Sequence, residues 1–147
     1  MATAPDSKSF KLEIVSPERK VFGGDVEFGV FPGSEGEFGI LPRHAPLLSQ
    51  LIAGEIKLVQ KGKPTYYAVS GGFLEVKGNK ATVAVETCEL SSEIDKERAQ
   101  RSKNLAQTLL QEKKDKAELL EAKLRWKRAE ARLKVAVKAT LPDQSKH

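Results

Sequence analysis

The chain has 147 residues, 31% of them charged, and a formal net charge of +5. Its single cysteine, Cys88, excludes an internal disulfide and suits a reducing compartment, and no apolar run approaches the roughly 18 residues of a membrane-spanning helix. Two histidines without metal-ligand spacing, and the lack of phosphate-loop or nucleophile-elbow motifs, argue against a metal site and against an enzyme.

The chain changes character near residue 92. Residues 1–94 carry ten Lys/Arg and twelve Asp/Glu, a net charge of −2, whereas residues 95–138 carry fourteen and seven, a net charge of +7. Residues 93–138 contain neither Gly nor Pro. This division predicts a compact, near-neutral β module followed by a basic helical arm.

Residues 1–7 have no apolar core and are expected to form a disordered lead. Residues 8–91 contain short apolar stretches, most of them alternating with polar residues, and these predict strands. The stretches lie around residues 10–14, 26–30, 56–58, 65–70, 73–76 and 81–85. Turn signals separate them, at residues 16–18, 23–25, 61–64, 71–72 and 78–79. Spacings of roughly 8–12 residues favour an all-β sandwich or flattened barrel.

The arm contains two helix-start signals. Ser92 begins a capping box of the form S-x-x-[DE], and Asp115 repeats this pattern with Asp as the cap. They predict helices over about 93–110 and 115–138, joined near residues 112–114 in an antiparallel hairpin. A Leu-Pro pair ends the second helix, and residues 139–147 are expected to fray.

Each predicted helix carries a thin apolar stripe. The first stripe consists of Ile94, Leu105, Ala106, Leu109 and Leu110, and the second of Ala117, Leu120, Leu124, Ala131 and Val135. Burial of such thin stripes, at about 25 cal/mol per Å², would offset the entropy of ordering the hairpin only weakly. We therefore expect an arm that can dock, extend or melt.

Arg98, Arg128 and Arg132 interrupt these stripes and allow two interpretations. The guanidinium groups can reach water or pair with Asp95 and nearby glutamates. Alternatively, they converge between the helices and form a pocket that clamps phosphate groups.

Five segments, taken together and in order, resemble the epsilon subunit of bacterial F-type ATP synthases. They are LEIVSPERKVFGGDVE (12–27), GSEGEFGILPRHAPLL (33–48), SGGFLEVKGNKATV (70–83), EIDKERA (93–99) and KRAEARL (127–133). The resemblance extends over about residues 10–137. It implies an α+β fold, in which a flattened ten-stranded β-sandwich precedes a C-terminal antiparallel two-helix hairpin.

The resemblance also implies a non-catalytic subunit of the central stalk. Such a subunit binds the gamma subunit and the c ring, couples proton flow to ATP synthesis, and restrains ATP hydrolysis through its C-terminal helices. It requires no cofactor and lies on the cytoplasmic side of the bacterial inner membrane, held there only by the complex. A nucleic-acid-binding module is the main rival, but the β part is acidic and its aromatic residues are spaced as core.

Three positions are implied to contact the c ring: Glu37, Arg43 and His44. Arg43 departs from the family pattern, in which glycine usually precedes this histidine. A large cation there is expected to add a contact with the ring or to alter the turn. For His44 the alternative is a histidine that caps its own turn.

In some bacterial members the folded hairpin binds ATP. The positions that match their pattern are Glu89, Ile94, Asp95, Arg98, Ala99, Arg128 and Arg132. Leu105 stands where those members carry a basic residue, and the loss of one charge-assisted bond weakens affinity roughly ten- to a hundredfold. ATP is thus a candidate regulatory ligand, and we expect it to favour the retracted hairpin, which alone brings the arginines together.

The second helix is basic, with Lys123, Arg125, Lys127 and Lys134 assigned to one face. This face could simply be solvated. For a brake on hydrolysis, Arg125, Lys127 and Lys134 should face an acidic loop of the catalytic alpha/beta head. Trp126 is expected to anchor an interface with gamma or with the sandwich.

Overall fold

The computed structural model describes residues 8–112 and 115–139. Its strands are β1 (Phe10–Val15), β2 (Lys20–Val26), β3 (Phe28–Gly33), β4 (Gly36–Ile40), β5 (Leu47–Gln60), β6 (Lys63–Lys77), β7 (Lys80–Val85) and β8 (Cys88–Leu90). A short 3₁₀ helix, η1 (Ser91–Glu93), precedes α1 (Lys96–Gln111) and α2 (Lys116–Lys138). The expected lead at residues 1–7, most of the expected joint between the helices, and the tail from residue 140 lie outside the described residues.

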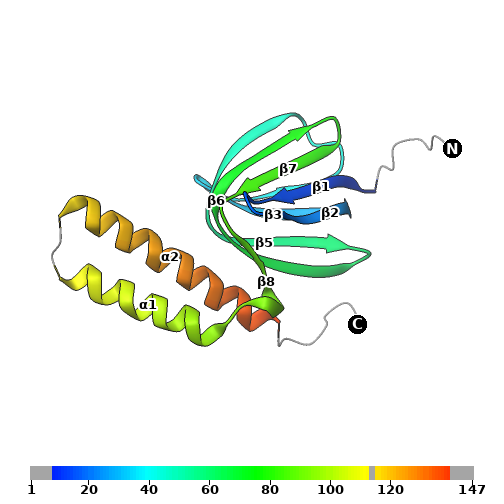
Figure 1. The fold of residues 1–147 in the computed structure, drawn as a ribbon. Coiled ribbons are helices and arrows are strands. Elements are labelled where there is room, and N and C mark those ends of the chain that lie inside the picture. The colour runs from blue at the N-terminus through cyan, green and yellow to red at the C-terminus, as the bar shows by residue number, and fades with distance from the viewer. Residues whose placement is uncertain (1–7, 113–114, 140–147) are drawn as a thin grey trace.

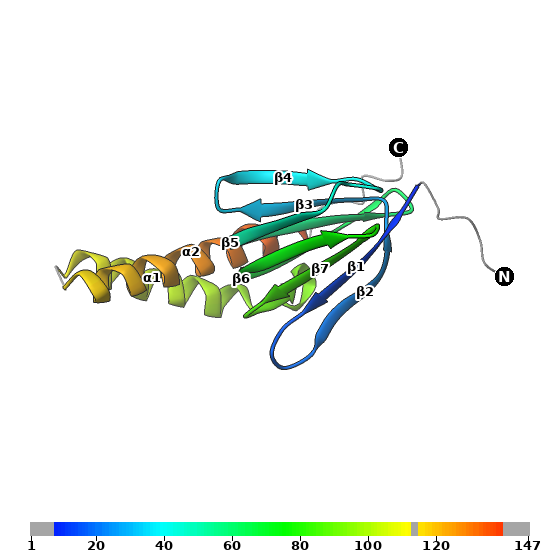
Figure 2. The same cartoon turned by 90° about the horizontal axis from the view of Figure 1, so that it is seen from above.

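The strands form one hydrogen-bonded sheet in the order β2-β1-β7-β6-β5-β3-β4, and β8 pairs with β6. Only β1 and β7 pair in parallel among these strands. The sheet folds over itself into a flattened sandwich, beside which the two helices lie as an antiparallel pair (Figures 1 and 2). The predicted class, a β-sandwich followed by a helical hairpin, is confirmed.

The long strands β5 and β6, of 14 and 15 residues, belong to both layers of the sandwich. Their pairing skips one residue on each strand, between the pairs Ile52–Gly71 and Gly54–Val69. Counting each of these strands twice, at this bend, turns the eight observed strands into the expected ten. Gly71 and Gly72 were expected to separate two strands, but they carry β6 through the bend with φ values of 117° and 156°.

Two local predictions in the first strands are wrong. Residues 23–25 were expected to form a turn, but they lie inside β2 and pair with β1. Residues 26–30 do not form one strand, since β2 ends at Val26 and β3 begins at Phe28. The break at Glu27 changes which side chains face inward, so that Phe31 is buried while Phe28 and Val30 are only half-buried.

The sandwich has a continuous core between its layers. Alternating residues of β1 and β7 supply much of it, as the sequence predicted, because their side chains point inward at every second position. The largest fully buried side chains in the sandwich are Phe31, Leu12, Ile14, Ile40, Ile56, Leu58, Leu74, Val26 and Val83.

The first helix begins at Lys96, three residues later than predicted. Ser92 does not cap it, because Ile94 is extended and buries its side chain against the sandwich. Asp95 is the N-cap, and its carboxylate accepts a hydrogen bond from the Arg98 amide at 3.1 Å. The second cap is as predicted, since Asp115 accepts from the Glu118 amide at 2.9 Å.

Alanines spaced seven residues apart fill the contact between α1 and α2. Ala99 and Ala106 of α1, and Ala122 and Ala129 of α2, are all buried, whereas Ala136, seven residues further on, is buried against the sandwich. Three of the five leucines assigned to the apolar stripes are exposed instead: Leu105 is 53%, Leu120 is 59% and Leu124 is 48% accessible. Leu109 and Leu110 are half-buried. The hairpin extends beyond the sheet, so no sheet covers this part of the stripes (Figures 1 and 2). Within the described residues, no helix combines the length and apolar character required to cross a bilayer.

Candidate functional site

The hairpin rests on the sandwich through a small apolar cluster at the C-terminal end of α2. Val135 and Ala136 are fully buried there and pack with Ala68 of β6 and with Ile94. Tyr66 covers the cluster at one side. This cluster is separate from the core of the sandwich. The attachment of the hairpin is therefore distinct from the packing that holds the sheet together.

Two ion pairs flank this apolar cluster. Arg132 Nε donates to Glu89 Oε1 at 2.6 Å, and Lys138 Nζ donates to Glu55 Oε2 at 2.5 Å. The ammonium group of Lys138 also lies 4.5 Å from the centroid of the Tyr66 ring. These contacts join α2 to three different strands, β5, β6 and β8.

The structure brings some of the predicted nucleotide-binding residues together. Glu89 and Arg132 form an ion pair, and Asp95 is used as the cap of α1. Arg98 and Arg128 are exposed, and neither forms an ion pair with any residue that the structure describes.

The two apolar members of the predicted nucleotide set, Ile94 and Ala99, are buried. Ala99 belongs to the alanine contact between the helices, and Ile94 to the cluster on the sandwich. Both therefore have packing roles in the docked hairpin, and only polar members of the set remain exposed to a ligand.

Glu37 and His44, the residues expected at the c ring, line one open hollow of about 630 Å³ at the β3–β4 hairpin. The His44 ring nitrogen Nδ1 lies 2.7 Å from the Ala45 carbonyl oxygen, and the His44 amide donates to the Leu41 carbonyl. The histidine thus makes the turn contacts that its alternative interpretation expected. Contact with a ring stays a prediction.

Arg43 has the backbone conformation that glycine favours. Its φ is 64°, in the left-handed region, where a side chain costs roughly 1–2 kcal/mol. The Arg43 amide donates to Asn79 Oδ1 at 2.7 Å, and the Asn79 side-chain amide donates to the Ser9 carbonyl at 3.1 Å. The turn therefore keeps a glycine-like shape despite the large side chain.

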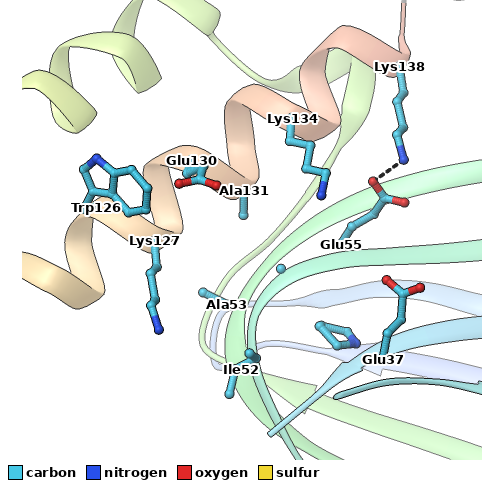
Figure 3. Close-up of a pocket in the computed structure, with 12 residues that line it drawn as sticks. Glu37, Ile52, Ala53, Glu55, Trp126, Lys127, Glu130, Ala131, Lys134 and Lys138 are labelled. Carbon is cyan, nitrogen blue, oxygen red and sulfur yellow. Dashed lines mark hydrogen bonds and ion pairs between the residues drawn. The ribbon is translucent and has the colours of Figure 1, made fainter. Parts of the chain in front are cut away.

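A cleft of about 480 Å³ separates α2 from the bend of β5 (Figure 3). Lys127 and Lys134 point into it from α2. Arg125 lies elsewhere, in an ion pair with Glu121 at 3.6 Å. Arg125 lies two positions before Lys127, and two positions along a helix correspond to a rotation of about 200°. The prediction that these residues share one basic face is thus wrong for Arg125.

Trp126 also lines this cleft, beside the sandwich. The ammonium group of Lys103 on α1 lies 5.2 Å from the centre of its ring. The ring thus contributes to the contact between the two helices as well as to the wall of the cleft. The carboxylate of Glu130 lies near it, and its Oε2 atom is buried without a hydrogen-bond partner among the described residues (Figure 3).

Cys88 is buried, and burial raises the pKa of its thiol from 9.0 to about 12. The folded protein should therefore react with iodoacetamide only slowly at pH 9, whereas the urea-unfolded chain should react quickly with a midpoint near pH 9. Because the unfolded thiol ionises first, this group should lower stability progressively between about pH 9 and pH 12. Equal alkylation rates of the folded and unfolded chains would contradict the burial.

The residues that hold the hairpin on the sandwich were missed from the sequence. They are Glu55, Tyr66, Ala68 and Lys138. The alternation through residues 65–70 carried one usable signal, because Tyr66 and Ala68 face one side of β6 while Tyr67 and Val69 face the core. Nothing local identified Glu55 and Lys138 as partners, since they lie 83 positions apart in the sequence.

Comparisons with known proteins show which family the chain belongs to. The beta-sandwich domain of the ATP synthase Delta/Epsilon chain matches residues 9–91, and the long alpha-helix domain of the same chain matches residues 92–136. The chain belongs to the ATP synthase epsilon family. It is 41% identical over 130 residues to the ATP synthase epsilon chain of Desulforamulus reducens, covering 88% of this chain and 98% of that one.

Another member of this epsilon family, from Pelotomaculum thermopropionicum, is 47% identical over 106 residues, which cover 72% of this chain and 79% of the relative. Among solved structures, a chain of the Euglena gracilis mitochondrial ATP synthase (OSCP/F1/c-ring) superposes with a TM-score of 0.79 at 21% identity. That match covers 93% of this chain and 86% of the other. At this identity it supports the fold alone.

Proposed function

We propose that this epsilon-family chain is a non-catalytic subunit of the ATP synthase central stalk. Its sandwich binds the gamma subunit and the c ring, and so helps couple proton flow to ATP synthesis. Its hairpin restrains ATP hydrolysis at the alpha/beta head. The complex holds it peripherally on the cytoplasmic side of the bacterial inner membrane, in keeping with its bacterial relatives.

One observation supports a movable hairpin above all others. The hairpin contacts the sandwich through a few apolar residues and two ion pairs, while the sandwich has a core of its own. Release of the hairpin therefore exposes little apolar surface and leaves the sheet intact, so it costs far less than unfolding the domain.

For the second proposed role, the coupling of proton flow to ATP synthesis, the candidate contacts with the c ring are Glu37, Arg43 and His44. Glu37 and His44 border one hollow, and the neighbouring turn is held in shape by the bond from Arg43 to Asn79. A pre-shaped turn suits a contact that must transmit torque, because its backbone is already ordered and loses little conformational entropy on binding.

Removal of residues 93–147 should raise ATP hydrolysis by the reconstituted complex without loss of the epsilon chain from the stalk. Co-purification with gamma and the catalytic head, followed by hydrolysis assays of the full-length and truncated complexes, measures both effects. Charge reversal at Lys127 and Lys134 should relieve the restraint in part if these lysines contact an acidic loop. Unchanged hydrolysis after truncation would contradict the proposal that the hairpin restrains hydrolysis.

ATP is proposed as a weak regulatory ligand of the docked hairpin. Arg98 and Arg128 are available for phosphate groups, whereas Arg132 must first exchange Glu89 for the ligand. The cost of this exchange and the lack of a basic residue at position 105 both weaken binding. We therefore expect a dissociation constant in the millimolar range, which corresponds to a binding free energy of roughly −4 kcal/mol. Bound nucleotide should favour the retracted, antiparallel hairpin, because only that state brings arginines of both helices together.

Titration of ATP into the purified chain should therefore give a weak saturable heat that Arg128→Gln abolishes. Arg101→Gln is the matched control, since it removes an exposed arginine of α1 outside the matched pattern and should leave the heat unchanged. No saturable heat in the millimolar range, or equal loss in both variants, would contradict a specific site.

A further inference from the structure

Three neighbouring residues on the sandwich form a row under α2. Glu55 of β5 pairs with Ala68 of β6, and Ala68 in turn pairs with Glu89 of β8. Since directly paired residues of adjacent strands point to the same face, the row presents a carboxylate, a methyl group and a second carboxylate to the helix. The row therefore has an apolar centre and two acidic ends.

The helix complements this row residue by residue. Lys138 pairs with Glu55, Val135 and Ala136 pack against Ala68, and Arg132 pairs with Glu89. The positions 132, 135 and 138 are three apart, so they follow one side of the helix. Because both ends of the row are charged, sliding or rotating α2 would break both ion pairs at once. The row thus fixes both the position and the rotation of α2.

The two ends of the row differ in their surroundings. The side chains of Arg132 and Glu89 are 32% and 33% exposed, whereas those of Lys138 and Glu55 are 26% and 18% exposed. Lys138 also has the Tyr66 ring beneath it and lies in the last turn of α2, where the helix dipole favours a cation. Three separate interactions therefore favour the docked position of Lys138.

We propose that Glu55, Tyr66 and Lys138 form a latch that sets the fraction of docked hairpin, independently of any anion bound by the arginines. The Arg132 end of the row can exchange Glu89 for an anionic ligand, but the latch contains no residue of the matched nucleotide pattern. An anion at Arg132 can then rearrange one end while the latch keeps the helix on the sheet. The latch is a property of the free chain, and only its effect on hydrolysis rests on the proposed function.

Amide hydrogen exchange in the full-length chain tests the latch. Glu55→Gln and Lys138→Gln should each speed exchange across residues 131–138 about tenfold, while amides of β1 and β7 stay unchanged. The Glu55→Gln/Lys138→Gln double variant should be no worse than Lys138→Gln alone, because that single variant already removes the ion pair together with the contact to Tyr66. Raising salt should speed exchange more in the unmodified chain than in the double variant, which keeps only the Arg132–Glu89 pair of the row.

The control is Glu13→Gln, which removes an ion pair between β1 and Lys80 of β7 and should not change exchange in α2. Unchanged exchange in both single variants, or strictly additive effects in the double variant, would overturn the latch. Amide exchange is measured in the free chain and does not depend on hydrolysis. The latch can therefore be confirmed even if truncation of the hairpin leaves hydrolysis unaffected. Conversely, truncation can raise hydrolysis even if the exchange experiments contradict the latch.

Discussion

Gly72→Ala should lower the free energy of unfolding by about 3 kcal/mol. A Cβ atom at this position would lie 2.0 Å from the Ala84 carbonyl oxygen and 2.8 Å from the Val85 Cα, both backbone atoms of the paired strand β7. Neither atom can move without distorting the sheet, and the φ of 156° is rarely adopted by a residue with a side chain. Urea denaturation followed by circular dichroism measures the loss.

Gly24→Ala provides the matched control for this substitution. The added methyl group would meet side-chain atoms only, at 3.4 Å or more, and the backbone there is not left-handed. Its effect on the free energy of unfolding should stay within about 0.5 kcal/mol. Equal stability of the two variants would mean that β6 does not approach β7 closely at the bend.

The bend of β6 matters for function because it connects two parts with different roles. Before the bend, Tyr66 and Ala68 hold the hairpin, and after it Leu74 and Val76 fill the core between the layers. A distorted bend should therefore disturb docking as well as stability.

Features that depend on neighbouring residues could be predicted from the sequence. The cap at Asp115 needs only a carboxylate three residues before an amide donor, and the strand of Phe10, Leu12 and Ile14 needs only alternation. The start of α1 was missed because Ile94 is drawn out of the helix by burial against Ala68 and Val135. Tertiary packing there outweighs the local capping signal.

Features that depend on distant residues could not be predicted. The stripe of α2 has the right spacing throughout, but Val135 is buried and Leu120 is exposed because the sheet lies under only part of the helix. The row of Glu55, Ala68 and Glu89 exists only through the register of three strands. That register is set by the whole sheet, and no pattern within a single strand encodes it.

Ala129→Leu should destabilise the hairpin by about 2 kcal/mol while leaving the sandwich folded. Ala129 is 1% exposed and belongs to the alanine contact between the helices, which leaves no room for three additional carbon atoms. The helices must separate or tilt, and Lys103 would move away from Trp126. Faster amide exchange across both helices, with unchanged exchange in β1 and β7, measures the effect.

Ala117→Leu is the control, because Ala117 is exposed near the start of the same helix and should tolerate leucine at a cost within about 0.5 kcal/mol. The comparison also bears on regulation. Arg98 and Arg128 each directly precede a buried alanine of the contact, Ala99 and Ala129, so helices forced apart would carry these two arginines away from each other. Ala129→Leu should therefore weaken ATP binding without touching an arginine, and unimpaired binding in a splayed hairpin would show that the arginines do not act together.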